Sequence, residues 1–199
     1  MSTRNRKVVA CLLALVFGAW GAWLGTQAHA QESRPTETEK QDESDYAVTF
    51  GRAVGMPGQA VALSVFFTRR SDVPNIRKLR LRLSFPTAAL SYDKLEAAYL
   101  ARRAGLELRP IQGGSGNNGT LDLTFTLPES SSREFPNGQI AYVHFTVSSE
   151  AKGGAISLHP EAWIEEKPIP SPEFRARLED AKIIVTTSPI LVGCFFFTH

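Results

Sequence analysis

Three histidines outside the first 30 residues have the side chains best suited to metal binding or acid–base catalysis: His144, His159 and His199. None lies four residues from another, and neither an H-E-x-x-H sequence nor a cysteine cluster accompanies them, so the spacing does not support a zinc site. His144 occupies a polar position of an alternating segment, and no catalytic partner for it can be named from the sequence. We therefore predict no metal and no other cofactor.

The glycine-rich segment 114–119 matches the G-x-G-x-x-G pattern of dinucleotide-binding loops. That chemistry needs a helix directly after the glycines, because the helix N-terminus holds the pyrophosphate. Residues 121–127 alternate between apolar and polar instead, as a strand does. Ser115 also fails the nucleophile pattern G-x-S-x-G, since Asn117 replaces the last glycine. The segment is predicted to be a hairpin loop.

Glu165 and Glu166 are the remaining candidates for catalysis, as a pair of carboxylates. On a strand, adjacent side chains point to opposite faces, so these two could not act on one substrate. No nucleophile, base and orienting group can be assembled, which predicts that the chain is not an enzyme. Outside the first 30 residues the chain has 19 basic and 20 acidic residues, a balance that argues against nucleic acid as a partner.

Short alternating segments must position any functional side chains: 61–67, 79–85, 121–127 and 140–147. Alternation with a period of two buries one face and exposes the other, as in antiparallel sheets. Turn residues separate these segments, at 56–58, 113–119 and 136–138. The pattern predicts an all-β fold, an antiparallel β-sandwich of jelly-roll type.

One short helix is expected within this sandwich. Asp93-Lys94-Leu95-Glu96 resembles a capping box, and apolar residues follow at helical spacing until Gly105. Prolines 168, 170 and 172 favour an extended crossing before a final strand near 181–186.

The two ends of the chain differ from its middle. Residues 1–30 form a predicted signal peptide for general export, with a charged start, an apolar run and the cleavage sequence Ala28-His29-Ala30. This predicts an extracytoplasmic, bacterial location, either secreted, periplasmic or at the cell surface; an uncleaved leader would instead tether the domain to the membrane. Residues 31–45 are predicted to be an acidic, disordered linker, and residues 188–199 an apolar tail. Cys11 and Cys194 cannot form a disulfide framework.

Three passages resemble those of the cohesin domain, the module that captures dockerins in cellulosome-type assemblies. They are the turn and strand of Gly55–Val65, the strand and turn of Leu79–Leu90, and the later strand of Asn137–Val147. The resemblance covers residues 46–187. It implies a jelly-roll sandwich of about nine strands, with a binding face made by one sheet and without catalysis or a required metal.

The predicted function is therefore a non-catalytic, cohesin-like module that attaches noncovalently to a dockerin-type protein in polysaccharide-degrading or cell-surface assemblies. If the predicted strands are neighbours, their outward side chains form a polar face for that partner. These candidate partner-binding residues are Arg80, Arg82, Asp122, Thr124, Tyr142 and His144. Residues 46–111 hold 11 basic and 4 acidic groups, a charge that could steer an acidic partner. The same positions could also be no more than a solvent-exposed side.

The alternative function is a carbohydrate-binding module, a class that shares this architecture and binds polysaccharide directly. Such modules stack sugars on exposed aromatic rings. Trp163 is the only tryptophan beyond the first 30 residues and is therefore the candidate carbohydrate-binding residue.

Overall fold

The computed structural model describes residues 44–170 and 175–188. Its elements are β1 (Tyr46–Phe50), β2 (Ala53–Gly55), β3 (Ala60–Arg69), β4 (Lys78–Pro86), β5 (Leu90–Ala97), α1 (Tyr99–Ala104), β6 (Glu107–Ser115), β7 (Asn118–Thr126), β8 (Gly138–Val147), β9 (Gly154–Ile164), β10 (Lys167–Ile169), β11 (Ala176–Leu178) and β12 (Ala181–Val185).

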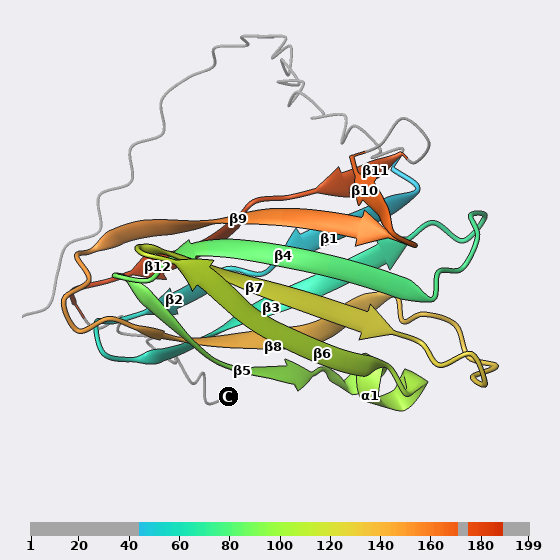
Figure 1. The fold of residues 1–199 in the computed structure, drawn as a ribbon, viewed down its shortest axis with the longest axis horizontal. Helices are drawn as coiled ribbons and strands as arrows, with labels where there is room; N and C mark the ends of the chain where they lie inside the picture. Colours follow the sequence, from blue (N-terminus) through green and yellow to red (C-terminus); the bar gives the residue numbers. More distant parts are fainter. Residues whose placement is uncertain (1–43, 171–174, 189–199) are drawn as a thin grey trace, which may run out of the picture. The chain divides into compact units, whose positions relative to one another are not determined.

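The strands form two stacked sheets (Figure 1). The smaller sheet has the order β11-β1-β3-β8-β5, and the larger has the order β2-β12-β9-β4-β7-β6, with β10 paired to β9. Most pairs are antiparallel, but β1–β11 and β2–β12 are parallel, so both sheets are mixed. The predicted all-β sandwich with one short helix is confirmed.

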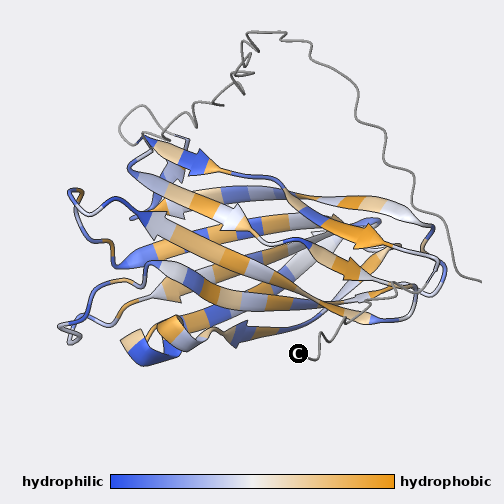
Figure 2. Ribbon diagram, turned by 180° about the vertical axis from the view of Figure 1, so that it is seen from behind, coloured by the Kyte–Doolittle hydropathy of each residue, from blue (hydrophilic) through white to orange (hydrophobic). Residues whose placement is uncertain are grey.

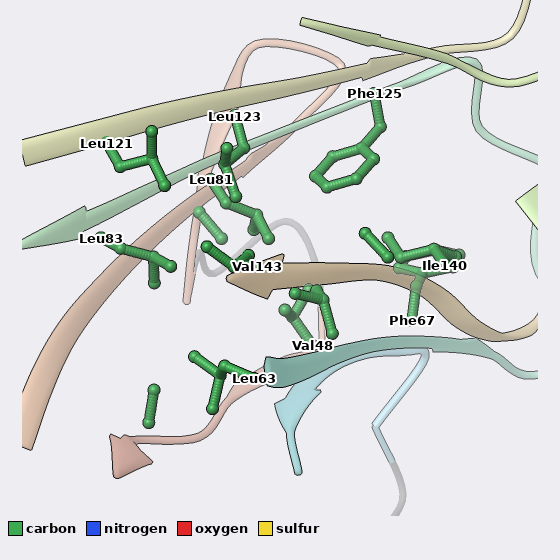
Figure 3. Close-up of a cluster of buried hydrophobic side chains, with 14 of the residues drawn as sticks. Val48, Leu63, Phe67, Leu81, Leu83, Leu121, Leu123, Phe125, Ile140 and Val143 are labelled. Carbon is green, nitrogen blue, oxygen red and sulfur yellow. The ribbon is translucent and has the colours of Figure 1, made fainter. Parts of the chain in front are cut away.

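Strict alternation of side chains along the strands produces the core between the two sheets, and the ribbon coloured by hydropathy shows it as alternating bands (Figure 2). Leu81 of β4 and Leu123 of β7 are fully buried and face Leu63 of β3 and Val143 of β8 across the sandwich (Figure 3). Each such side chain contributes roughly 1.5–3 kcal/mol through its removal from water. The same alternation turns every second side chain outward, which gives each sheet a polar outer face.

The turns predicted at 56–58 and within 113–119 are present, whereas residues 136–138 lead directly into β8 without a turn. Gly58 has a φ of 78°, and the Gln59 N–H donates to the Met56 carbonyl at 3.0 Å, as expected for a type II-like turn. The segment that matched G-x-G-x-x-G is the β6–β7 hairpin, in which Ser115 pairs with Asn118. Gly119 is required there for packing rather than for phosphate binding, because a Cβ at this position would lie 2.6 Å from the Phe85 ring.

The prediction of a helix starting at Asp93 is wrong. Strand β5 continues to Ala97, and α1 covers only Tyr99–Ala104, ending at Gly105 as predicted. Asp93 lies where the pairing of β5 with β8 shifts by one residue, and its carboxylate accepts a hydrogen bond of 2.8 Å from the Thr146 hydroxyl. Pairing with β8 satisfies the backbone of this segment, so the local capping pattern is overridden by a tertiary contact.

The final strand near 181–186 is confirmed as β12, which pairs with β9 and β2. No helix among the described residues is long and apolar enough to span a membrane. The predicted signal peptide, the linker as far as residue 43 and the tail from residue 189 lie outside the described residues, as do His199 and both cysteines.

Candidate functional site

The structure divides the six predicted partner-binding residues between two opposite outer faces. Strands β4 and β7 are neighbours in the larger sheet, where Arg82 lies opposite Asp122 and Arg80 opposite Thr124. Tyr142 and His144 lie on β8, which belongs to the smaller sheet. The condition for one continuous face, that all of these strands are neighbours, is therefore not met, because alternation shows which way a side chain points but not which sheet its strand joins.

The outward side chains of β9, β4, β7 and β6 form what we call the large-sheet face. Its members are Lys78, Arg80, Arg82, Arg109, Ile111, Asp122, Thr124, Glu161 and Trp163. Two rows cross the four strands in register. One row is Trp163–Arg80–Thr124–Arg109, and the other is Glu161–Arg82–Asp122–Ile111. The face thus contains both charges, an aromatic ring and an aliphatic side chain.

Arg82 and Asp122 form a bidentate ion pair in this face. Arg82 Nε lies 2.9 Å from Asp122 Oδ1, and Arg82 Nη2 lies 3.2 Å from Asp122 Oδ2. The hydrogen bonds to Asp122 hold the pKa of Arg82 above its usual value. Glu161 is a more distant partner, with its Oε2 at 3.8 Å from Arg82 Nη1. Arg82 is therefore fixed from within the sheet.

Arg80 stacks on Trp163 instead. The guanidinium carbon of Arg80 lies 4.1 Å from the centre of the indole ring, and that of Arg82 lies 5.7 Å away. These are cation–π distances. Trp163 is half-buried, and Arg80 already covers its ring. The ring is therefore not a bare platform of the kind on which a sugar would stack.

The outer face of the smaller sheet is bonded within itself. Tyr142 donates to Gln139 Oε1 at 3.2 Å, and the Gln139 amide donates to the Ser64 hydroxyl at 2.8 Å. His144 Nε2 lies 3.4 Å from Glu96 Oε2. Tyr142, Gln139 and Ser64 are thus linked by hydrogen bonds across β8 and β3, whereas His144 Nε2 has no hydrogen bond to any described residue.

Glu165 and Glu166 do not lie on a strand, so the strand geometry assumed for them is wrong. They form the two-residue turn between β9 and β10, with φ values of 47° and 65°. Glu165 accepts hydrogen bonds from the backbone N–H groups of Arg77 and Lys78. Glu166 binds the Lys78 ammonium, which holds the pKa of this carboxyl below its usual value. Both carboxylates therefore stabilise the turn.

Ile111 and Arg109 also belong to the face but were not predicted from the sequence. Both lie on β6, and Ile111 is 66% exposed. Pro110 interrupts this segment, and proline within an alternating run argues against a strand. Proline is tolerated here because β6 is an edge strand that pairs only with β7 among the described strands. The alternation of Leu106, Leu108 and Pro110 with charged residues was the available signal.

The described titratable side chains do not form a metal site on or near the large-sheet face. Among residues 44–170 and 175–188, no three His, Cys, Asp or Glu side chains are placed to hold a metal ion. His159 is exposed in the middle of β9, opposite Ser84 of β4.

Comparison with known proteins identifies the fold. No protein-family model matches this chain, and no curated protein matches it. The third cohesin of ScaC from Acetivibrio cellulolyticus, solved with the ScaB dockerin, is 23% identical, with a TM-score of 0.55 over 70% of this chain and 98% of that chain. CaCohA2 from Clostridium acetobutylicum is 19% identical, with a TM-score of 0.54 over 73% of this chain and 94% of that chain.

A non-cellulosomal cohesin from the archaeon Archaeoglobus fulgidus is also similar. It is 13% identical, with a TM-score of 0.50, and the match covers 72% of this chain and 92% of that chain. The chain therefore has the cohesin fold, and the resemblance predicted from the sequence is confirmed at that level.

Proposed function

We propose that this chain is a protein-docking module whose large-sheet face receives a dockerin-type partner. The observation that carries the proposal is the content of that face, where Trp163, Arg80 and Arg82 adjoin one another and Ile111 is exposed. Tryptophan and arginine are the residues most enriched among those that dominate binding energy in protein interfaces. The cohesin of Acetivibrio cellulolyticus was solved with a dockerin bound, which supports a protein as the partner.

The outer face of the smaller sheet is the less suitable surface. Its Tyr142, Gln139 and Ser64 side chains already donate to and accept from one another. A partner on that face would have to break these bonds or leave them unused. The large-sheet face offers an exposed aliphatic side chain beside charged ones, which matches an apolar interface core with a polar rim.

The module works outside the cytoplasm in this proposal, without catalysing a reaction. Support comes from the signal-peptide pattern of residues 1–30, and the linker of residues 31–45 would then separate the domain of residues 46–187 from the point of export. Mass spectrometry of the exported protein tests this directly. An N-terminus at Gln31 supports cleavage, and an intact leader supports a membrane tether.

Calorimetry of the full chain against dockerin-bearing proteins tests the docking function. Two matched variants add an arginine at an outward threonine: Thr124→Arg on the large-sheet face and Thr146→Arg on the opposite face. We expect saturable binding by the wild type, at least a tenfold loss in Thr124→Arg and less than a threefold change in Thr146→Arg. A folded wild type that binds no dockerin contradicts the dockerin form of the proposal.

A polysaccharide series in the same experiment tests the carbohydrate alternative. Sugar binding that is lost in Trp163→Ala, together with no protein binding, would replace docking by carbohydrate recognition. The position of Arg80 over the Trp163 ring favours the protein partner.

A further inference from the structure

Three of the four cations on the large-sheet face are neutralised by a carboxylate of the same domain. Each of these three has a carboxylate oxygen within 3.4 Å, in the pairs Lys78–Glu166, Arg82–Asp122 and Arg109–Glu107. The fourth cation is Arg80. Its Nε has no hydrogen-bond partner among the described residues, and its Nη1 lies 3.9 Å from Glu166 Oε2, beyond hydrogen-bonding distance. Glu166 is moreover already bound by Lys78.

Stacking holds Arg80 in place although its nearest carboxylate, that of Glu166, is too distant for a hydrogen bond. Its guanidinium lies over Trp163 on one side, and Thr124 stands opposite it on the neighbouring strand. A stacked guanidinium loses little further freedom when it binds a planar anion, because its fork of N–H donors is already oriented. Arg80 is thus preorganised for a carboxylate, which would bind through the Nη groups because Nε is buried, whereas Asp122 binds Arg82 through Nε and Nη2.

We propose that Arg80, held on Trp163, binds an aspartate or glutamate side chain of the docked protein, while an apolar side chain of the same protein packs on Ile111. This inference rests on the proposed docking function and names the chemistry of its partner. Ile111 lies two strands and two residues away from Arg80 in the register, a separation of about 12 Å. The two contact groups of the partner should be separated by a similar distance.

The surroundings of Arg80 favour one carboxylate over a polyanion. Asp122, Glu161 and Glu166 lie on or beside the same face, and they would repel a sulfated polysaccharide or a nucleic acid. A single carboxylate can reach Arg80 between them. The 66% exposure of Ile111 adds an apolar contact that a protein side chain uses and a polyanion does not.

A random dodecapeptide library displayed on phage and selected against the full chain provides the probe. We expect the selected peptides to be enriched in Asp and Glu and to contain an apolar residue. Binding of the recovered peptides, measured by fluorescence polarisation, should weaken at least tenfold in Arg80→Gln and clearly in Arg80→Lys, which keeps the charge but not the fork. Arg103→Gln on α1, an exposed arginine outside the face, should change affinity less than twofold.

Peptides in which each Asp or Glu is replaced by Asn or Gln give a measurement that does not depend on the folding of a protein variant. Their binding to the wild type should weaken by the same factor as in Arg80→Gln. Peptides without acidic enrichment, or with equal affinity for wild type and Arg80→Gln, overturn the inference. If Thr124→Arg abolishes binding while Arg80→Gln does not, the docking function stands and this inference fails. If neither variant weakens binding, both fail.

Discussion

Arg82 and Asp122 face each other across β4 and β7 and are joined by two hydrogen bonds, of 2.9 and 3.2 Å. The pair lies between Glu161 on one side and Ile111 on the other, in the middle of the large-sheet face. It therefore fixes the local shape of the surface that we propose to dock a partner, and it leaves Arg82 less available to that partner than Arg80.

This ion pair should contribute modestly to stability. A double-mutant cycle with Arg82→Ala, Asp122→Ala and the double variant should give a coupling free energy of about 0.5–1 kcal/mol in urea unfolding, because the pair is partly exposed and screened by solvent. The coupling should decrease in 1 M salt. A cycle on Arg109 and Glu107, which are more exposed, provides the control and should give a smaller value.

Leu123→Ala should be strongly destabilising. Leu123 is fully buried on β7 between the sheets, so its truncation should lower the free energy of unfolding by about 2–5 kcal/mol. Leu108→Ala removes the same atoms from a half-buried position on the edge strand β6 and should cost clearly less. Urea denaturation of the two variants makes the comparison, and equal losses would contradict the assignment of β7 to the core.

Gly119→Ala should destabilise the β6–β7 hairpin by overpacking. The added Cβ would lie 2.6 Å from the Phe85 ring, so either the ring or the strand must move, at a cost of about 1–3 kcal/mol. Gly113→Ala is the matched control, because its Cβ would meet only the Thr120 hydroxyl, at 3.1 Å. Thermal unfolding should show a lower Tm for the first variant than for the second.

Lys78→Met should raise the pKa of Glu166. The bond to Lys78 lowers the pKa of Glu166 in the folded state. It therefore stabilises the fold at pH values above the pKa of Glu166 in the unfolded chain, and this stabilisation is lost as the pH falls through the pKa of Glu166 in the folded state. The Tm advantage of the wild type over Lys78→Met should therefore shrink below a pH of about 4. Titration by NMR reports the pKa itself. Lys152 precedes β9 and Glu166 follows it, so the two lie toward opposite ends of this strand. The control variant Lys152→Met should therefore leave the pKa of Glu166 unchanged.

The direction of side chains could be predicted from the sequence, but the pairing of strands could not. Alternation correctly placed Arg80 and Arg82 outward and Leu81 inward, because a period of two is a property of each strand alone. That β8 joins the smaller sheet depends on contacts with β3 and β5, which are distant in sequence. The sequence therefore could not separate Tyr142 and His144 from the residues of the large-sheet face.

Local patterns failed where a long-range contact was stronger. The capping box at Asp93 predicted a helix, yet β8 draws this segment into the sheet. Ile111 was not among the predicted residues. Its neighbour Pro110 argues against a strand, and only the position of β6 at the edge makes that proline acceptable. Trp163, by contrast, was found from composition alone, although the arginine stacked on it could not be foreseen.

The proline in β6 also removes one backbone donor from the open edge of the larger sheet. In a two-residue hairpin, the two residues that flank the turn, here Ser115 and Asn118, exchange backbone hydrogen bonds, and so does every second pair after them. Pro110 and Leu123 form one of the intervening pairs, so the nitrogen of Pro110 points toward the open edge. An added strand would find no donor there, so its ladder would be interrupted halfway along. Pairing with an added strand, including one from a second copy of the chain, is therefore disfavoured at this edge.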